Sequence, residues 1–380
     1  MNFELSEDHK LIKQYVRDFA EAEIAPTTAE RDRKSECPTE IIKKCGEMGY
    51  FGMFIPEEYG GAGMDYLSYV LAIEEFARVD ASVAVILSVT NSLAAYSIFK
   101  FGNEDQKQKF LVPLASGKKL GGYMLTEAGA GSDAGSLRAT AILKGDNYVI
   151  NGSKMFITSG LMADTFIVFA KTDPEAKSGR GISAFVVDAK AKGLSVSKKE
   201  NKLGIRSSDT CEMVFEDCEI PKENLLGEEG DGFKMALHIL DGGRVGISAQ
   251  ANGISTAALE NAIKYANERK QFNRTIGSFQ AIQFKLADMA TKLEAARLLM
   301  IQAAWKKQNE MKCTKECAMS KVFSSESCTW ITNQAVQIFG GYGYMNEYPV
   351  ERLMRDAKIT ELYEGTSEVQ RIVISRNIMK

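Results

Sequence analysis

The sequence predicts a multidomain α+β protein with an N-terminal helical domain at residues 1–121, a middle antiparallel β domain at 122–228 and a C-terminal helical bundle at 229–380. Three observations support this prediction. Apolar residues recur at helical spacing in the first segment, short β-rich runs separated by turn signals follow, and long helical repeats return after Asp231. Because each segment has its own periodicity, each is expected to bury its own apolar face.

Within the N-terminal segment, the helical pattern begins with the stripe Leu11, Ile12, Tyr15, Val16 and Phe19, for which Ser6 is a suitable N-cap. Further helices are expected at residues 39–48, 67–79, 82–100 and 104–115. Strands are expected in the middle segment at residues 148–150, 154–158, 166–170, 184–187 and 213–215. Turn signals such as Asn151-Gly152 separate these strands.

Two apolar stripes run along the C-terminal segment. The first consists of Phe279, Ile282, Leu286, Met289, Leu293, Ala296, Met300 and Ala303, which alternate three and four residues apart. The second and weaker stripe consists of Ala318, Val322, Ser325, Thr329, Thr332 and Val336. Both fit the core of an antiparallel helical bundle, and an oligomer interface is compatible with the same pattern.

Composition excludes several classes of protein. With 380 residues, 45% of them hydrophobic and 26% charged, the chain has an ordinary globular composition. A net charge of −3 without a dense basic block gives no reason to expect a nucleic-acid partner. The most apolar run, residues 81–101, includes Ser88, Asn91 and Ser97, so we expect a core helix and no membrane span.

The cysteines and the first residues indicate a cellular compartment. Seven cysteines without a CxxC pair suggest reduced thiols. Only His9 and His238 could join Cys313 and Cys317 as ligands, so no metal site is expected. The acidic N-terminus lacks the apolar core of a signal peptide, and we expect a cytoplasmic bacterial protein.

Two glycine-rich stretches are candidates for ligand contact. In the loop from Tyr123 to Gly135, the spacing of the glycines does not fit a dinucleotide-binding turn, and a hairpin follows where that motif needs a helix. Its bare amides and the hydroxyls of Thr126 and Ser132 suit a flavin edge or a phosphate, although a turn-rich connection has the same composition. The second stretch, residues 337–344, is either a helix C-cap or a close backbone approach to a ligand.

The stretch from Pro349 to Arg376 predicts two helices with a short exposed break between them. Ser367 and Gln370 form a capping box for the second helix, which places Glu364 just before a helix N-terminus and beside Gly365. Glu364 is either a general base or an ordinary surface acid, and the spacing alone leaves both readings open. The chain has no GxSxG, GxxxxGK[ST] or HExxH motif, so hydrolase triads, P-loop phosphoryl transfer and zinc catalysis lose support.

Several stretches together resemble the acyl-CoA dehydrogenase family, and most closely its short-chain, butyryl-CoA type. They span most of the chain in the family's order, which makes the resemblance specific. The matching stretches are YMLTEAGAGSD (123–133), FITSG (156–160), LGIRSSDTCEMVFEDCEIPKENLLGEEGDGF (203–233), LDGGRVGISAQANG (240–253), ERKQF (268–272), QIFGGYGY (337–344) and RDAKITELYEGTSEVQR (355–371).

The resemblance implies a C-terminal four-helix bundle, a homotetramer and an FAD cofactor between the β domain and the bundle. Flavin-side positions are Tyr123, Leu125, Thr126, Ser132, Phe156 and Thr158. Positions that reach the cofactor across a subunit interface are Arg269, Phe272, Gln280, Gln337, Gly340 and Gly341, and further cofactor contacts are Thr366 and Glu368. Substrate positions are Ser132, Asp241, Arg244 and Gly365.

By the same resemblance, Glu364 is the catalytic base. Family members desaturate an acyl-CoA: a carboxylate removes the α proton while the β hydrogen leaves as hydride to the flavin, and the electrons pass to an electron-transfer flavoprotein. Hydrogen bonds to the thioester carbonyl, including one from the Glu364 amide, are expected to stabilise the enolate. Burial around Glu364 is expected to raise its pKa.

Departures from the family pattern narrow the prediction. Some branches carry the base on the helix that holds LDGGR, but that position is Gly243 here. Ala84 stands where the glutaryl branch has an arginine, which argues against a dicarboxyl substrate, and Phe156 replaces a common tryptophan. An acyl-CoA oxidase, a dehydrogenase for a branched or cyclic acyl-CoA, and a helical scaffold without cofactor are the alternatives.

Overall fold

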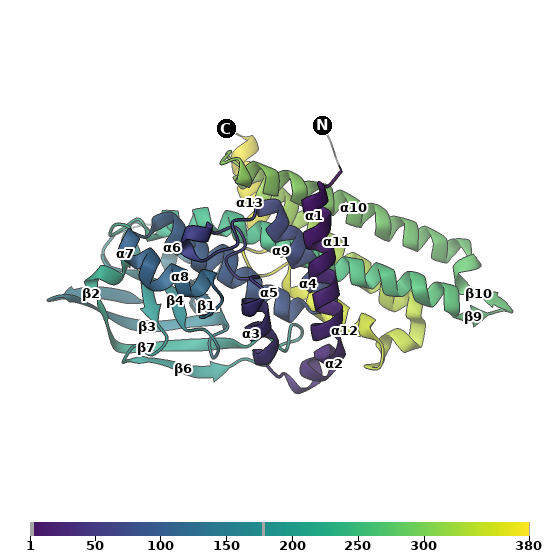
Figure 1. Cartoon of the computed structure of the whole chain (residues 1–380), viewed down its shortest axis with the longest axis horizontal. Helices are drawn as coiled ribbons and strands as arrows, with labels where there is room; N and C mark the ends of the chain where they lie inside the picture. The colour runs from purple at the N-terminus through teal and green to yellow at the C-terminus, as the bar shows by residue number, and fades with distance from the viewer. Residues whose placement is uncertain (1–3, 177–178, 380) are drawn as a thin grey trace.

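The computed structural model describes residues 4–176 and 179–379. Figure 1 shows an elongated molecule with the sheet at one end and the long helices of the C-terminal segment extending to the other. The predicted order of domains, a helical domain followed by a β domain and a second helical domain, is confirmed. β1 begins at Gly121 and α9 at Gly232, whereas the residue limits of the domains stay predictions.

The N-terminal helices pack around an apolar interior. They are α1 (Glu7–Phe19), α2 (Ala25–Lys34), α3 (Thr39–Glu47), α4 (Tyr66–Val79), α5 (Ala81–Ser88), α6 (Tyr96–Phe101), α7 (Glu104–Gln106) and α8 (Val112–Ala115). Ser6 caps α1 as predicted, because its Oγ accepts a hydrogen bond from the amide of His9 at 3.2 Å. π-helical turns join several of these helices, at Ala20–Ile24, Val89–Ala95 and Lys107–Leu111.

The run Ala81–Phe101 is long and apolar enough to cross a membrane by length and composition. However, 89% of its most apolar window is buried inside the protein. Its small polar groups bond within the protein, as where the side-chain amide of Asn91 donates to the carbonyl of Leu87 at 2.9 Å. The run is therefore accounted for as a core helix, as the sequence predicts.

The middle segment forms one twisted sheet. Its strands are β1 (Gly121–Met124), β2 (Thr140–Lys144), β3 (Asn147–Thr158), β4 (Thr165–Lys171), β5 (Ile182–Asp188), β6 (Leu194–Lys199), β7 (Thr210–Pro221) and β8 (Leu225–Leu226). The order is β6-β7-β3-β2-β4-β5-β8, with β1 beside β4. Most neighbours are antiparallel, but β1 and β2 each pair with β4 in parallel, so the sheet is mixed.

The C-terminal helices are α9 (Gly232–Glu268), α10 (Gln280–Gln308), α11 (Thr314–Phe339), α12 (Pro349–Ile359) and α13 (Ser367–Ile378), and a short hairpin of β9 (Lys270–Gln271) and β10 (Arg274–Thr275) joins α9 to α10. The predicted stripe on α10 is buried from Met289 to Ala303, whereas Ile282 and Leu286 are partly exposed. Of the predicted second stripe, Ala318, Ser325 and Thr332 are fully buried on α11, whereas Val322, Thr329 and Val336 are partly exposed. The side chains of Cys317, Lys321, Cys328 and Ile331, which lie outside the predicted stripe, are also fully buried.

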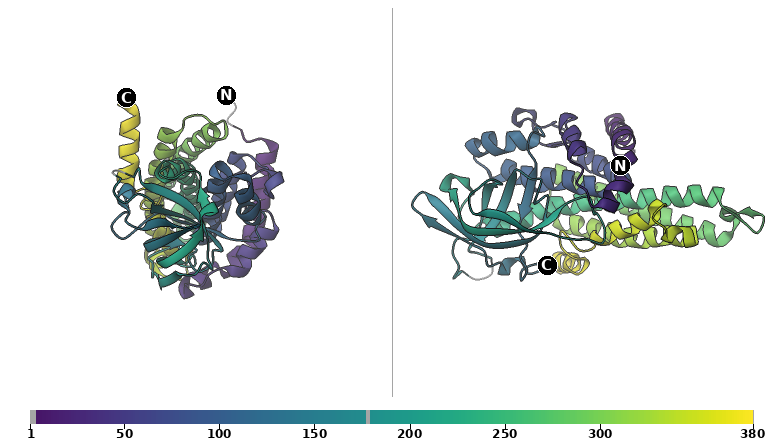
Figure 2. Two further views of the ribbon diagram at one scale, coloured as in Figure 1. Left: turned by 90° about the vertical axis from the view of Figure 1, so that its left-hand side faces the viewer. Right: turned by 90° about the horizontal axis from the view of Figure 1, so that it is seen from below.

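One apolar cluster joins all three segments. Ile98, Phe110 and Leu114 of the N-terminal helices pack on Phe169 of the sheet and on Ala236 near the start of α9. Figure 2 shows these helices against the sheet, with α13 on another side of the molecule, where it packs against α11. Where the three segments meet, one cavity is lined by residues of the sheet, α5, α9 and α13.

Candidate active site

A cavity of about 1050 Å³ lies where the sheet meets α5, α9 and α13. Its wall brings together a large part of the predicted site. The predicted residues that line it are Tyr123, Leu125, Thr126, Ser132, Phe156, Thr158, Arg244, Glu364 and Gly365. These residues come from four separate stretches of the sequence, so only the folded chain assembles them.

Glu364 lies in the turn between α12 and α13. Its φ is 55° and that of Gly365 is 90°, so both residues have left-handed backbone, which is uncommon for glutamate. The predicted capping box is wrong: Thr366, not Ser367, caps α13, and its Oγ1 accepts from the amide of Val369 at 3.3 Å. Ser367 is the first residue of the helix itself.

The Gln370 side chain does not complete a capping box either. Its Nε2 donates to the carbonyl of Glu364 at 3.0 Å and to that of Gly365 at 2.8 Å. Sequence reasoning placed Gln370 at a helix terminus and missed this role. These two hydrogen bonds hold the backbone of the strained turn. They do not involve the Glu364 carboxyl group, which lines the cavity.

The Glu364 carboxyl group has the properties of a general base. Its Oε2 is buried and has no hydrogen-bond partner among the residues that the structure describes. Burial raises the pKa of Glu364 to about 7, while the positive charges of Arg244 and Lys321 oppose that rise. A carboxylate whose pKa lies near the working pH combines useful basicity with a substantial ionised fraction.

Gly243 on α9 provides the room for this carboxyl group. A Cβ at position 243 would lie 2.3 Å from Oε2 of Glu364 and 2.8 Å from Oε1. Both distances are far below van der Waals contact, so a side chain at this position and the observed position of Glu364 exclude each other. The glycine at position 243, where some branches of the family carry the base, therefore leaves space for the Glu364 carboxyl group. The sequence alone does not show this steric effect.

Part of the cavity wall is apolar. Val85, Val89, Leu93 and Ile247 contribute to it, together with Tyr363. The hydroxyl group of Tyr363 donates to the side-chain carbonyl of Gln250, and the Gln250 amide donates to the carbonyl of Ala81 at 2.8 Å. Gln250 is fully buried, so these bonds hold the Tyr363 ring in place in the wall.

A buried ion pair supports the glycine-rich loop. Lys154 on β3 is fully buried, and its Nζ donates to Oε1 of Glu127 at 2.8 Å and to the carbonyl of Leu125 at 3.2 Å. Glu127 also accepts from the amides of Arg138 and Ala139, at 2.6 and 3.0 Å. These bonds tie the start of the loop to its end, so they fix the Leu125 and Thr126 backbone at the cavity.

We expect Lys154→Met to destabilise the folded protein by about 3–5 kcal/mol, because Glu127 would be left as an unpaired buried charge. Urea unfolding followed by circular dichroism measures this loss. The double variant Lys154→Met/Glu127→Gln is the control, since it removes the orphaned charge and keeps one of the two acceptor oxygens. It should recover part of the lost stability, and a double variant no more stable than Lys154→Met would contradict the electrostatic explanation.

The two predicted substrate residues on α9 have different positions. Arg244 lines the cavity, whereas Asp241 does not. Asp241 accepts from Nη1 of Arg244 and from Oγ1 of Thr314, both at 2.6 Å. Asp241 thus orients the guanidinium group of Arg244 instead of facing the cavity itself.

The predicted residues of the second group are not brought to this cavity within one chain. The β9–β10 hairpin lies at the opposite end of the molecule from the sheet (Figure 1), and Phe272 on it is 87% exposed. Arg269, Gly340 and Gly341 line a separate hollow of about 520 Å³. Gln280 and Gln337 are exposed on α10 and α11.

This distribution agrees with the expectation that the second group acts on a neighbouring subunit, which stays a prediction. Thr366 and Glu368 at the start of α13 do not line the large cavity either. Thr366 is the cap of that helix, and Glu368 is exposed.

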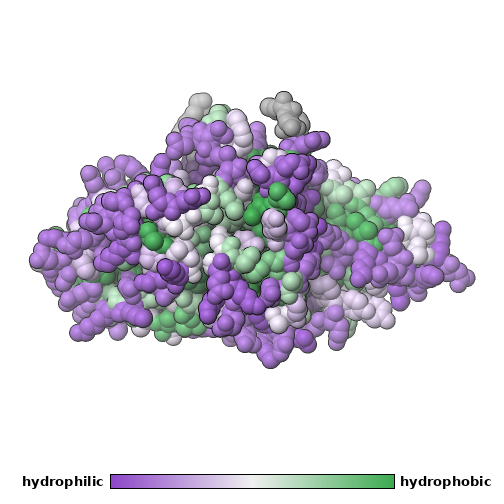
Figure 3. All heavy atoms as spheres, viewed as in Figure 1, coloured by the Kyte–Doolittle hydropathy of each residue, from purple (hydrophilic) through white to green (hydrophobic). Residues whose placement is uncertain are grey.

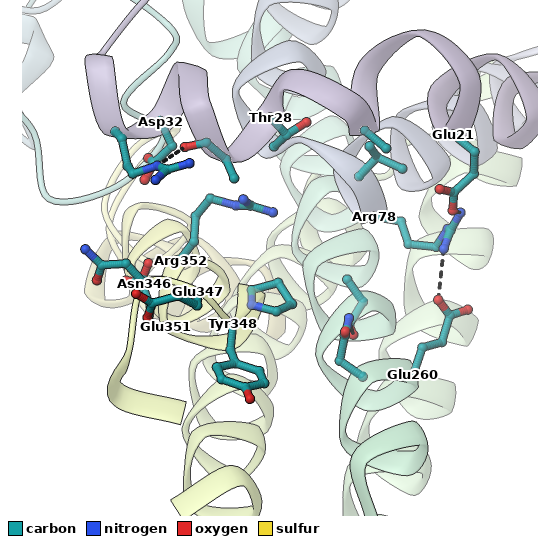
Figure 4. A pocket seen from close by; sticks show the side chains of 17 residues that line it. Glu21, Thr28, Asp32, Arg78, Glu260, Asn346, Glu347, Tyr348, Glu351 and Arg352 are labelled. Atoms are coloured by element: carbon teal, nitrogen blue, oxygen red, sulfur yellow. Dashed lines mark hydrogen bonds and ion pairs between the residues drawn. The ribbon is translucent and has the colours of Figure 1, made fainter. Parts of the chain in front are cut away.

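A smaller cavity of about 330 Å³ lies between α2, α9 and α12 (Figure 4). Most of the charged residues labelled in Figure 4 form ion pairs; for example, Arg78 binds Glu21 and, at 2.9 Å, Glu260. None of the predicted site residues lines it. The large cavity is therefore the candidate active site, even though the smaller one is well formed.

The residues around the large cavity fit a flavin. The loop glycines Gly129 and Gly131 have open space where a Cβ would stand, which permits a close approach of the backbone to a ligand. The hydroxyl group of Tyr123 is buried without a hydrogen-bond partner among the described residues. A large planar cofactor with polar edges would pack against the apolar wall and offer a hydrogen-bond partner to the Tyr123 hydroxyl group.

Sequence reasoning missed Lys154 and Lys321, which are both fully buried. Lys321 donates from Nζ to the carbonyl of Gly365 at 2.8 Å. One signal was present: the small residues Ser320, Ser324 and Ser325 lie within one turn of Lys321 on the same helix, which leaves room to enclose a long side chain.

The fold and the cavity together indicate a flavin-dependent oxidoreductase, with one carboxyl group at the cavity whose Oε2 is buried and unpaired among the described residues. Domain models of the acyl-CoA dehydrogenase family match residues 6–118 (N-terminal domain), 122–218 (middle domain) and 230–379 (C-terminal domain). The chain belongs to the acyl-CoA dehydrogenase family, whose members are FAD-dependent.

Similar proteins match over the whole chain. The short-chain specific acyl-CoA dehydrogenase of Clostridium acetobutylicum is 51% identical over 380 residues, which are 100% of both chains. The structure of butyryl-CoA dehydrogenase from Megasphaera elsdenii matches with a TM-score of 0.98 and 48% identity over 100% of both chains. A chain from a structure described as the electron transferring flavoprotein of Acidaminococcus fermentans matches with a TM-score of 0.99 and 51% identity, again over 100% of both chains.

Proposed function

We propose that this protein oxidises a short-chain acyl-CoA thioester to the trans-2-enoyl-CoA, with Glu364 as the base that removes the α proton. The observation that carries the proposal is the unpaired, buried Oε2 of Glu364 in a cavity whose residues fit a flavin. The identity of about half to the short-chain enzyme of C. acetobutylicum supports the choice of substrate class.

Glu364 has a defined task in this reaction. In its ionised form it accepts the α proton, and burial then favours the neutral acid that results, because the pKa of the group is already raised. Arg244 and Lys321 keep part of the resting population ionised. The amide of Glu364 is the proposed donor to the thioester carbonyl, where the negative charge of the enolate develops.

FAD, when bound, supplies the acceptor for the β hydride. Its proposed contacts within the same chain are Tyr123, Leu125, Thr126, Ser132, Phe156, Thr158, Thr366 and Glu368. The contacts proposed to come from a neighbouring subunit are Arg269, Phe272, Gln280, Gln337, Gly340 and Gly341. Ser132, Arg244 and Gly365 are proposed to contact the acyl-CoA, and Asp241 to hold Arg244 in place.

The apolar part of the cavity wall suits an acyl chain. Val85, Val89, Leu93 and Ile247 line the same cavity as Glu364, so an acyl chain bound there would contact apolar side chains. The preference for a straight short chain over a branched or cyclic acyl group rests on the identity to the short-chain enzyme of C. acetobutylicum and to the butyryl-CoA dehydrogenase of M. elsdenii.

The proposed assembly is a homotetramer in the bacterial cytoplasm that passes electrons to an electron-transfer flavoprotein. Figure 3 shows a mainly hydrophilic face with scattered apolar patches. On α10, Phe284, Leu298 and Trp305 are 64%, 44% and 53% exposed. Large apolar side chains at the surface of a long helix are typical of subunit contacts.

A spectroscopic titration tests the proposed function. The FAD-loaded protein is mixed without oxygen with butyryl-CoA, octanoyl-CoA and palmitoyl-CoA, and the loss of the visible flavin absorbance is recorded. We expect rapid bleaching by butyryl-CoA and much slower bleaching by palmitoyl-CoA. Equal rates would contradict the short-chain assignment, and peroxide release on turnover in air would favour the acyl-CoA oxidase alternative.

A further inference from the structure

Lys321 occupies an unusual position for a lysine. Its side chain lies on α11, fully buried, and reaches the turn that carries Glu364. Its one hydrogen bond among the described residues is the 2.8 Å contact of Nζ with the carbonyl of Gly365. A buried ammonium group bonded only to a neutral carbonyl is costly unless a negative charge lies nearby.

The Glu364 carboxylate provides that negative charge. Lys321 and Glu364 influence each other: Glu364 opposes the lowering of the Lys321 pKa by burial, and Lys321 opposes the raising of the Glu364 pKa by burial. The resulting pKa values are about 8 for Lys321 and about 7 for Glu364. The two groups therefore titrate in adjoining ranges of pH.

We propose that Lys321 is a positioning residue for Glu364, which clamps the carbonyl of Gly365 and supplies a buried positive charge that keeps the carboxylate ionised. Gln370 holds the same turn through the carbonyls of Glu364 and Gly365 but carries no charge. Both side chains thus hold the turn, and of the two only Lys321 adds a charge. This inference rests on the proposed role of Glu364 as the base.

Other charged and titratable groups surround the pair from every neighbouring element. Arg244 on α9 is the second positive charge, and it lowers the pKa of both Glu364 and Lys321. Glu361 before α13 and Glu326 on α11 are further negative charges that act on Lys321. The tyrosines that feel the Glu364 charge are Tyr69 on α4, Tyr123 on β1 and Tyr363 in the turn itself.

The test compares pH profiles of flavin reduction by butyryl-CoA in the FAD-loaded protein. In the wild type, the rate should rise with pH as Glu364 ionises. In Lys321→Met the midpoint of this rise should move up by roughly one pH unit, because an opposite charge near the carboxyl group is lost. Lys321→Arg keeps the charge and should leave the midpoint in place.

Gln370→Leu is the matched control for the turn. It removes hydrogen bonds to the same two carbonyls without changing the charge, so the rate should fall at every pH while the midpoint stays. A midpoint unchanged in Lys321→Met would overturn the proposal. An equal shift in Gln370→Leu would also overturn it, because the shift would then come from a disordered turn.

A second readout does not depend on turnover. Infrared difference spectra can follow the protonated carboxyl band that Glu364→Gln removes, and its titration midpoint should rise in Lys321→Met. If Lys321→Met does not fold, Lys321→Gln is the neutral substitute, since it keeps an N–H donor. Bleaching of Glu364→Gln by butyryl-CoA would refute the proposed function, whereas an unmoved carboxyl midpoint would refute the role of Lys321 alone.

Discussion

Glu364→Gln should bind FAD normally and lose the reduction of the flavin by butyryl-CoA, by roughly 10³-fold or more. Glutamine has nearly the same shape as glutamate but cannot accept a proton at this position. The carboxyl group lies at the cavity, and its Oε2 is unpaired within the described part of the chain. Among the described residues that line the cavity, the other carboxylate is Asp133, which is exposed on the glycine-rich loop. Stopped-flow absorbance without oxygen measures the rate.

Two variants make this result specific. Glu347→Gln changes an exposed glutamate in the loop before α12 and should leave the rate unchanged. Glu364→Asp keeps the charge but withdraws the carboxylate by one methylene group, so its rate should lie between those of the wild type and Glu364→Gln. Bleaching of Glu364→Gln at the rate of the wild type would show that another group removes the proton.

Gly243→Ala is expected to have the second largest effect, a loss of roughly 10²-fold in the same rate. The added methyl group would overlap the Glu364 carboxyl group, at 2.3 Å from Oε2, and must displace it from the observed position. The helix itself should not suffer, because alanine in a helix interior is more favourable than glycine by up to about 1 kcal/mol.

Thermal unfolding and FAD content therefore separate the two explanations for a slow Gly243→Ala variant. If displacement of the Glu364 carboxyl group is the cause, Gly243→Ala should have an unfolding temperature at or above that of the wild type, full FAD content and a low rate. A rate equal to that of the wild type would show that the carboxyl group has another working position. A slow variant that has lost its FAD would point to a disrupted cavity instead.

The sequence allowed the main layers to be predicted, because helical and strand periodicities are local signals. Which strands pair in the sheet could not be predicted from the sequence. β1 and β2 lie on either side of a long loop, and their parallel pairing with β4 depends on how the chain crosses over, which no local pattern encodes. β6 was missed because its side chains are mostly exposed and polar.

The candidate site was likewise predictable only in part. Glu364 could be singled out from its place in the turn and from the resemblance of the motif around it, although the cap proved to be Thr366. Lys321 precedes Glu364 by more than forty residues and is joined to it only by the packing of α11 against α13. The steric role of Gly243 is likewise a property of the folded chain.

The most direct measurement is a crystal structure of the FAD-loaded protein with a non-reactive butyryl-CoA analogue. If Glu364 is the base, one of its carboxyl oxygens should lie about 3–3.5 Å from the acyl Cα, with the cofactor ring on the other side of the acyl chain. A carboxyl group turned away from Cα, with a different side chain in its place, would show that Glu364 is not the base.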